Sequence, residues 1–312
     1  MRQRVDDPGL TDEDALSAFR ALARDSQIAF INSVLFAELK QTGRDFDRIG
    51  NYDRGYEAIR ALYPDLPGNY AGDLNLFFSQ LKTEQGGDID ITIPGGLVNA
   101  GLANPGNLTK GASDLGIVTV RGGTIHGFVH DDFLVNQSRV FTLQGGDILL
   151  WSSEGDIDAG KGAKTASATP PPQIVFRGDR FVLDTSRSIE GSGIGVLLGR
   201  EGIRPGDVDL IAPHGTVDAG DAGIRSAGNL TIAARQVRGA ENIQVGGVSA
   251  GVPTSGSSSL GGSLGGVSNA AANATKNAER ATQQLAADSA AAQKAQGLVP
   301  SFITVEVLGL GE

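Results

Sequence analysis

The sequence predicts a mainly β fold, in which a parallel β-helix (a solenoid of short strands) follows an N-terminal helical segment and precedes an Ala-rich helix. Three observations lead to this class. Glycine supplies 45 of the 312 residues, about twice its ordinary share, so tight turns must be frequent. Short strand-like runs separated by Gly, Asp and Asn fill the middle of the chain. Within that region, one fifteen-residue segment occurs three times.

Residues 1–82 have a helical pattern. Thr11 and Asp14 form a capping-box pair, with Asp in the place of Glu or Gln, and the apolar residues that follow recur close to every 3.6 positions. Gly43 is expected to end this helix. A second helix is expected over Asp53–Leu62, because its apolar residues share one face and a proline lies beyond its end. We interpret this segment as a small helical cap.

The repeated segment reads GDIDITIPGGLVNAG at 87–101, GDILLWSSEGDIDAG at 146–160 and GDVDLIAPHGTVDAG at 206–220. The three copies align without a gap, and their starts are 59 and 60 residues apart. Each copy opens with Gly-Asp, has Gly at its tenth place and closes with Ala-Gly, so these positions are the expected turn residues. They are Gly87, Asp88, Gly96, Gly101, Gly146, Asp147, Gly155, Gly160, Gly206, Asp207, Gly215 and Gly220.

Alternating aliphatic residues within the copies indicate strands with one buried face, so Ile89, Ile148 and Val208 are expected to point inward. Strands this short suit a parallel β-helix over residues 83–250, in which each coil satisfies the backbone of the next. A period near 60 then corresponds to about three coils of roughly 20 residues, or some eight coils in all. A sandwich or propeller ranks second, because the copies lack paired Asn-Gly hairpin turns.

The segments between the copies have a different composition. Residues 102–113 and 161–172 are rich in Gly, Pro, Ser, Thr or Ala. We expect them to form excursions, which are loops that project from the β-helix. The strand-like run Ile174–Leu183 is expected to continue the strands of the β-helix.

Three segments are expected after the β-helix. Residues 251–267 are rich in Gly and Ser, which predicts a flexible linker. Residues 268–297 are rich in alanine, which predicts a helix with little apolar surface to bury. Within residues 298–312, Phe302–Leu308 alternates like a strand, which would add to an end of the β-helix.

Composition excludes several classes of function. The net charge of -10 argues against nucleic acid or an anionic membrane as the main partner, because both attract basic surfaces. The absence of cysteine excludes a disulfide framework, a thiolate zinc site and a cysteine nucleophile. Neither a signal peptide nor a transmembrane segment is visible. A secreted or outer-surface location would therefore need an export signal elsewhere, on a longer polypeptide.

Two histidine regions contain residue types that bind metals. His126 and His130, followed by Asp131 and Asp132, could supply such ligands, but an i, i+4 pair does not converge on a strand as it does on a helix. We interpret these residues as polar groups on an exposed turn. His214 stands at a place where the other two copies have Glu and Gly, which indicates a solvated turn.

Calcium is a second metal hypothesis, raised by the Asp residues that open the copies and by Asp158 and Asp218 near their ends. The calcium-binding β-roll requires tandem nine-residue Gly/Asp repeats, which this sequence lacks. A stacked ladder of Asp and Asn residues that bind nearby backbone amides explains these positions more simply. We expect no cofactor.

Two short motifs carry little weight. The stretch Gly191–Gly195 resembles a dinucleotide-binding loop but lacks the helix that must follow it, so a turn is expected. Arg177, Gly178 and Asp179 form the tripeptide that integrins bind in some adhesins. Phenylalanine on both sides of this tripeptide predicts a strand-to-strand turn and leaves it a weak receptor motif.

Enzymes are the main competing class, because β-helices also include polysaccharide lyases and glycosidases. Those enzymes gather carboxylates with a Lys or Arg on one face, often with a metal ion. Acidic residues are scattered through the turns here, and the β region has one Trp and no Tyr to stack on sugars. The sequence therefore names no catalytic residue.

Several stretches resemble the C-terminal region of large exoproteins of the filamentous haemagglutinin family. They are FLVNQSRVFTLQGGDILLWSSEGDIDAGKGAKTASATPPP (133–172), NYDRGYEAIRALYP (51–64) and SAGNLTIAARQVRGAENIQVGG (226–247). The stretch around Trp151 is the most specific of these, and the resemblance spans most of residues 45–312.

The resemblance implies a right-handed parallel β-helix at the end of a surface-exposed adhesin exported by two-partner secretion. It implies a non-enzymatic structural or adhesive role, with a host or bacterial surface glycan or protein as partner and an outer-membrane secretion partner. The alternatives are a polysaccharide-degrading lyase or glycosidase, and a secretion or anchoring cap of the exoprotein.

Overall fold

The computed structural model describes residues 11–66, 68–103, 114–161, 173–177, 180–184, 191–197 and 202–253. The chain divides into two compact units, and every described residue belongs to the first, residues 1–261. The Ala-rich helix and the final strand expected over 268–312 lie outside the described residues. So do nearly all of the two excursions expected at 102–113 and 161–172, and most of the expected linker.

The N-terminal part of the described chain is helical. Its helices are α1 (Asp12–Arg20), α2 (Arg24–Arg44), α3 (Phe46–Ile49) and α4 (Asp53–Leu62). The capping box predicted at α1 is present, because the Thr11 hydroxyl accepts from the Asp14 amide and the Asp14 side chain accepts from the Thr11 amide. The predicted bounds of α4 are also confirmed.

The predicted role of Gly43 is wrong. α2 runs one residue further, and Gly43 is buried within it. A Cβ at this position would lie 2.4 Å from Cδ1 of Ile211, so glycine here lets the helix approach the sheet closely. The left-handed residue that ends this helical stretch is Gly50, with φ of 75°, directly after α3.

Two parallel sheets, of ten and six strands, follow the helices, and their strands lie in three rows. Row 1 stacks β3 (Ile89–Ile93), β6 (Ile125–Val129), β9 (Ile148–Ser152), the first half of β14 (Val208–Asp218), the first half of β16 (Leu230–Arg238) and β18 (Ser249–Ala250). Row 2 stacks β1 (Leu74–Asn75), β4 (Val98–Asn99), β7 (Phe133–Leu134), β10 (Ile157–Asp158) and the second halves of β14 and β16. Row 3 is the six-stranded sheet of β2 (Gln80–Thr83), β5 (Gly116–Thr119), β8 (Arg139–Thr142), β13 (Gly193–Val196), β15 (Ile224–Ser226) and β17 (Ile243–Val245).

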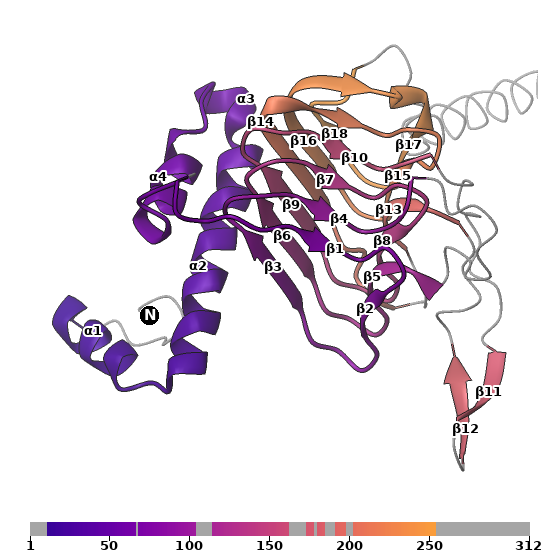
Figure 1. Ribbon diagram of the computed structural model, residues 1–312, viewed down its shortest axis with the longest axis horizontal. Coiled ribbons are helices and arrows are strands. Elements are labelled where there is room, and N and C mark those ends of the chain that lie inside the picture. The colour runs from indigo at the N-terminus through magenta and orange to yellow at the C-terminus, as the bar shows by residue number, and fades with distance from the viewer. Residues whose placement is uncertain are drawn as a thin grey trace, which may run out of the picture. The chain divides into compact units, whose positions relative to one another are not determined.

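The chain visits rows 1, 2 and 3 in turn and then repeats the cycle, so that each pass pairs in parallel with the pass before it (Figure 1). A short 3-10 turn, η2 (Ala240–Asn242), precedes β17. The stack therefore begins at β1 and β2, ahead of the boundary expected at residue 83.

Residues of row 1 alternate between two apolar cores. Ile148 and Val208 are fully buried among the rows and Ile89 packs against the same cluster, so the predicted inward orientation is confirmed. The residues between them face the other way, where Leu149 and Trp151 pack against α2 and α4. Figure 1 shows α2 lying across β6, β9 and β14. The helices thus cover one outer face of the stack.

The expected period of three coils per 60 residues is wrong. Ile148 pairs directly with Val208, so the second and third copies are neighbours in the stack. Ile125 of β6 lies between Ile89 and Ile148, so the first interval holds two passes. Row 1 has six strand positions in the described part of the chain, fewer than eight. The intervals agree in length only because the second contains a long insertion.

Two expectations about the region between the second and third copies are also wrong. Ile174–Leu183 does not continue the stack, because β11 (Gln173–Arg177) and β12 (Arg180–Asp184) form a separate antiparallel hairpin. Gly191–Gly195 does not form a turn, since Gly193–Val196 is strand β13 of row 3. Short glycine-rich strands and turns have the same composition, and only the pairing partner distinguishes them.

Candidate functional site

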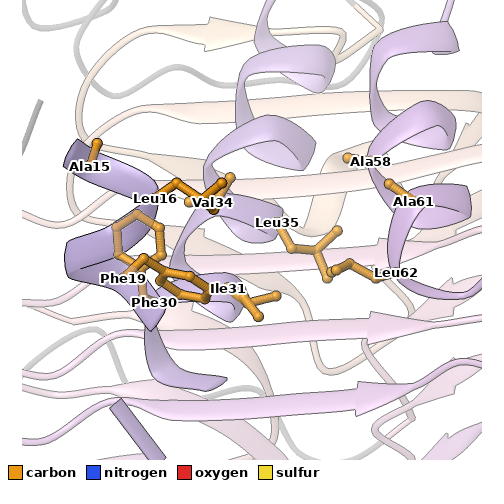
Figure 2. Close-up of a pocket in the computed structure, with 10 residues that line it drawn as sticks. All are labelled: Ala15, Leu16, Phe19, Phe30, Ile31, Val34, Leu35, Ala58, Ala61 and Leu62. Atoms are coloured by element: carbon orange, nitrogen blue, oxygen red, sulfur yellow. The ribbon is translucent and has the colours of Figure 1, made fainter. Parts of the chain in front are cut away.

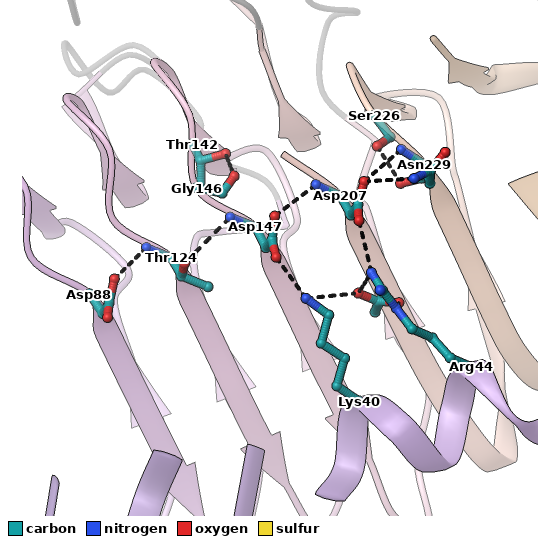
Figure 3. A network of polar contacts seen from close by, with 11 residues as sticks. Lys40, Arg44, Asp88, Thr124, Thr142, Gly146, Asp147, Asp207, Ser226 and Asn229 are labelled. Carbon is teal, nitrogen blue, oxygen red and sulfur yellow. Dashed lines mark hydrogen bonds and ion pairs between the residues drawn. The ribbon is translucent and has the colours of Figure 1, made fainter. Parts of the chain in front are cut away.

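A ladder of polar side chains runs along the start of row 1. The Asp88 carboxylate accepts a hydrogen bond from the Thr124 amide (2.7 Å), and Asp147 does the same for the Asp207 amide (2.9 Å). Asp207 in turn accepts from the backbone amide of Asn229 (2.9 Å). Figure 3 shows these residues in line, one from each successive strand. The structure therefore contains the ladder of Asp and Asn residues that the sequence predicted.

Two positions of this ladder were not predicted from the sequence. Thr124 and Asn229 stand where the recognised copies have Asp, each after a glycine and before an inward aliphatic residue. Asn229 accepts from the Val248 amide (2.9 Å) through its side-chain oxygen, as Asp does elsewhere. The position requires a short side chain with an acceptor oxygen, and a search for Asp alone missed these two.

Two cations from α2 meet three carboxylates of the stack (Figure 3). Lys40 donates to Asp147 (2.6 Å), while Arg44 donates to Asp207 (3.0 Å) and to Asp209 (2.7 and 3.0 Å). The Asp209 side chain is fully buried, and its charge is compensated by Arg44 and by Lys40 at 3.7 Å. This cluster fixes the register of α2 on rows of the sheet 100 residues or more away in sequence.

Electrostatics at this cluster favour the charged forms of Asp147 and Arg44. Burial alone would raise the pKa of Asp147, but hydrogen bonds from Lys40 and from the Asp207 amide outweigh it and lower that pKa below its usual value. The hydrogen bond from Arg44 to Asp209 is the largest influence on the guanidinium and raises the pKa of Arg44. Asp147 is thus held in its charged form. The carboxylates of the cluster already bind cations and backbone amides, which suits fixed ion pairs better than proton transfer.

The glycines of the copies lie where stacked backbones touch. A Cβ at Gly206, Gly215 or Gly220 would lie about 2 Å from the carbonyl oxygen of the equivalent glycine one pass below (2.0, 1.9 and 2.0 Å, respectively). Those equivalent glycines are Gly146, Gly155 and Gly160. Close backbone approach, more than turn conformation alone, therefore explains the repeated glycines. Of the remaining sequence-predicted turn residues, Gly96 makes the same kind of approach to the Gly72 carbonyl and Gly101 packs on Ser138, while Gly87 has a left-handed φ of 99°.

The histidines His126 and His130 have different partners. His126 lies within β6, where its Nδ1 contacts Asp90 (2.8 Å) and its ring stacks on Phe36 of α2 at 4.7 Å. His130 contacts Asp131 (2.8 Å), and Asp132 accepts from the Asp156 amide. The expectation of an exposed turn is therefore wrong for His126, which belongs to the helix–sheet interface.

His214 belongs to a small polar group on the same face. It is exposed, as expected, but lies within β14 instead of a turn. Its Nδ1 contacts Glu154 at 3.0 Å and the Tyr56 hydroxyl at 3.3 Å. Glu154 occupies the same place in the second copy, so two variable positions of adjacent copies bind each other. Within the described residues, no group of three or more His, Asp or Glu has the arrangement of a metal site.

The acidic residues near the ends of the copies stack directly. Asp158 pairs with Asp218 in register, and each accepts from the amide two residues later, of Gly160 (2.7 Å) and of Gly220 (2.8 Å). Burial raises the pKa of Asp158, and the neighbouring Asp218 charge adds to this rise. These aspartates hold tight turns and repel each other.

The receptor motif lies at the end of the separate hairpin. Arg177 is the last residue of β11 and pairs with Arg180, the first residue of β12. Gly178 and Asp179, which connect them, lie outside the described residues. The sequence prediction of a strand-to-strand connection agrees with this pairing.

An apolar groove of about 410 Å³ lies among α1, α2 and α4, and the sequence analysis did not predict it. Figure 2 shows its lining, which comes from the facing sides of the three helices. The lining residues are Ala15, Leu16, Phe19, Phe30, Ile31, Val34, Leu35, Ala58, Ala61 and Leu62. The helical spacing of the large apolar residues was visible in the sequence, but spacing alone does not show whether neighbouring helices fill the space between them.

Comparison with known proteins supports the resemblance over part of the chain. Residues 145–254 match the model of a family described as filamentous haemagglutinin family outer membrane protein. This segment contains the second and third copies, Trp151 and the hairpin, and it excludes the helices. No curated protein and no solved structure matches the chain. Among the described helices, none has the length and apolarity needed to cross a membrane.

Proposed function

We propose that this chain is a non-enzymatic, structural and adhesive portion of a secreted or cell-surface exoprotein of the filamentous haemagglutinin type. The three rows would then be the faces of a right-handed β-helix. Its partner would be a glycan or protein on a host or bacterial surface, with an outer-membrane secretion partner during export. The family match at residues 145–254 supports the exoprotein setting.

One observation carries the non-enzymatic part of the proposal. The acidic residues that open the copies, together with Asp209, bind backbone amides or the cations of α2. A catalytic carboxylate must instead face the substrate and change its protonation or its partners during the reaction. Side chains that are already bonded within the stack make it rigid. An adhesin needs such rigidity to present its binding surface.

The hairpin gives this stack an element suited to contact. β11 and β12 pair with each other and with no other described strand, so their sequence can vary without disturbing the rows. Arg177 ends β11 and pairs with Arg180, which begins β12, so Gly178 and Asp179 connect the two strands. We place surface recognition on this insertion.

Two other functions compete with this one. A polysaccharide lyase or glycosidase would need carboxylates that are accessible to a sugar. A secretion or anchoring cap would need the helices that cover row 1, where α2 and α4 bury Trp151. The ion pairs of Lys40 and Arg44 support the second alternative more than the first, because they fix the helices and occupy the carboxylates.

A binding and cleavage assay separates the three functions. The purified chain is incubated with a panel of polysaccharides, with and without calcium, while new reducing ends and retention on immobilised glycans or whole cells are measured. We expect retention without new reducing ends. Calcium-dependent cleavage that disappears in Asp207→Asn would overturn the proposal in favour of an enzyme. Neither retention nor cleavage would favour the cap.

A matched pair of variants tests the hairpin. Asp179→Glu keeps the charge of the tripeptide but moves the carboxylate, and Asp179→Ala removes it. Loss of cell retention in both would assign recognition to the tripeptide. Loss only after replacement of residues 173–184 by a Gly/Ser linker would assign it to the rest of the hairpin.

A further inference from the structure

α1 lies at the surface of the described part of the chain. None of its residues is buried, and Leu16, which lines the apolar groove, is 47% exposed. Phe19 contacts Phe30 of α2, with ring centroids 5.6 Å apart. The groove of about 410 Å³ that remains around these side chains shows that α1 fills its site incompletely (Figure 2).

The residues at the bend between α1 and α2 have no local preference for a bend. The connecting residues Ala21, Leu22 and Ala23 are strong helix formers, and no Gly or Pro occurs from Asp12 to Thr42. Local preference therefore favours one continuous helix through this point. The folded-back position of α1 therefore depends on the apolar contacts that it makes with α2, such as that of Phe19 with Phe30.

One side chain stabilises the bend. The Gln27 amide donates to the carbonyl oxygens of Leu22 (2.9 Å) and Arg20 (3.2 Å), at the end of α1. In a continuous helix the same two carbonyls would accept from the backbone amides of Ser26 and Arg24. Straightening the bend thus exchanges side-chain hydrogen bonds for backbone ones, with no carbonyl left unpaired.

We propose that α1 is exchanged between two copies of this chain, so that α1 of each copy packs beside α2 and α4 of the other and forms one wall of its apolar groove. The bend opens into a continuous helix and the chain forms a domain-swapped dimer. The partner is a second copy because α1 already forms one wall of this groove, and α1 of another copy makes the same contacts with Phe30 and its neighbours. The swap needs no new complementary surface.

The energy balance favours the exchange at high protein concentration. The contacts of α1 in the groove are equal in the two states, and the bend is replaced by helix at residues that favour helix. The dimer loses translational freedom, which concentration offsets. This inference concerns the helical segment alone and does not depend on the proposed adhesive function.

The first test measures the mass of the full-length chain by size-exclusion chromatography with light scattering over a wide range of concentration. We expect a dimer whose fraction rises with concentration. Ala21→Gly with Ala23→Gly should weaken the dimer by about two to three orders of magnitude, because glycine disfavours the continuous helix in both copies. Gln27→Ala should strengthen the dimer several-fold, because it removes the bonds that hold the bend.

The second test asks which copy supplies α1. The chain has no cysteine, so Phe19→Cys with Phe30→Cys introduces one specific pair, which is joined by oxidation or by a short bis-maleimide linker. In a swapped dimer the link joins two chains, and a denaturing gel shows a covalent dimer. A chain that stays monomeric at every concentration, or a dimer whose links all lie within single chains, would overturn the proposal. Unchanged circular dichroism and tryptophan emission show that the variants remain folded.

Discussion

The carboxylate of Asp147 accepts a hydrogen bond from the backbone amide of Asp207 at 2.9 Å, although sixty residues separate the two. They are the second residues of adjacent copies, so the repetition in sequence becomes a stack in space. The other carboxylate oxygen of Asp147 binds Lys40 of α2. One residue therefore joins two passes of the stack and the helices that cover it.

Removal of Arg44 should be the most damaging single change at the ion-pair cluster. Arg44→Met leaves the fully buried Asp209 with the longer contact to Lys40 at 3.7 Å, and loss of the main partner of a buried charge costs up to about 3–5 kcal/mol. The free energy of unfolding from urea titration measures this loss.

The control for this change neutralises the remaining charge. Adding Asp209→Asn to Arg44→Met should restore part of the lost stability, because the amide keeps an acceptor oxygen without the charge. If the double variant is no more stable than Arg44→Met, the ion pair is not the source of the effect.

Gly55→Ala should loosen the helices from the stack. A Cβ at Gly55 would lie 2.6 Å from Cη2 of the fully buried Trp151, whose ring cannot move aside. We expect a loss of about 1–3 kcal/mol in unfolding free energy and a red shift in the emission of this single tryptophan. Gly68→Ala is the matched control, because its Cβ has only an ordinary contact at 3.5 Å. Equal effects of the two substitutions would contradict the packing described.

Acid should release the helices through Asp147. Its pKa is lower in the folded chain than in the unfolded one, where it is about 4. Its contribution to stability is therefore complete above that unfolded value and disappears as the pH falls through the lower folded value. We expect stability measured by tryptophan emission to decline below about pH 4.

Asp147→Asn isolates this residue from other acids that titrate in the same range. The variant keeps an oxygen for the Asp207 amide but cannot ionise, so its stability should depend less on pH below pH 4 than that of the natural chain. An unchanged acid profile would show that other carboxylates control the transition.

Asp158→Asn should stabilise the chain at neutral pH. The folded pKa of Asp158 is raised, first by burial and then by Asp218, so its ionised form is disfavoured in the stack. Asparagine keeps the acceptor for the Gly160 amide, and Asn99 already stands at this place in the first copy. The gain in urea midpoint should shrink as the pH falls and natural Asp158 becomes protonated. A loss at pH 7 would contradict this account.

Local features of the fold were readable in the sequence. The bounds of α4, the capping box at Thr11 and the inward face of Ile148 depend on neighbouring residues and on side-chain period, and these were predicted correctly. The ladder was also predicted at its Asp positions, because short acceptor side chains at repeated turns have few other uses, but Thr124 and Asn229 were not recognised as members of it.

Features that depend on distant partners were missed. The number of passes between copies could not be counted, because an insertion such as the β11–β12 hairpin lengthens an interval without adding a pass. The second core was also missed, although Leu149 and Trp151 break the polar alternation expected of an exposed face. Apolar residues on both faces of a strand indicate two cores, but they do not name the helix that covers the outer one.

Amide hydrogen exchange at Asp207, followed by NMR, tests most directly whether the repeated carboxylates hold the stack together. The account expects this amide to exchange slowly in the natural chain and in Asp147→Asn, and about tenfold faster or more in Asp147→Ala, which has no acceptor. The amide of Ile232, in the next pass of row 1, serves as the internal reference. Equal exchange of the Asp207 amide in all three proteins would contradict the account.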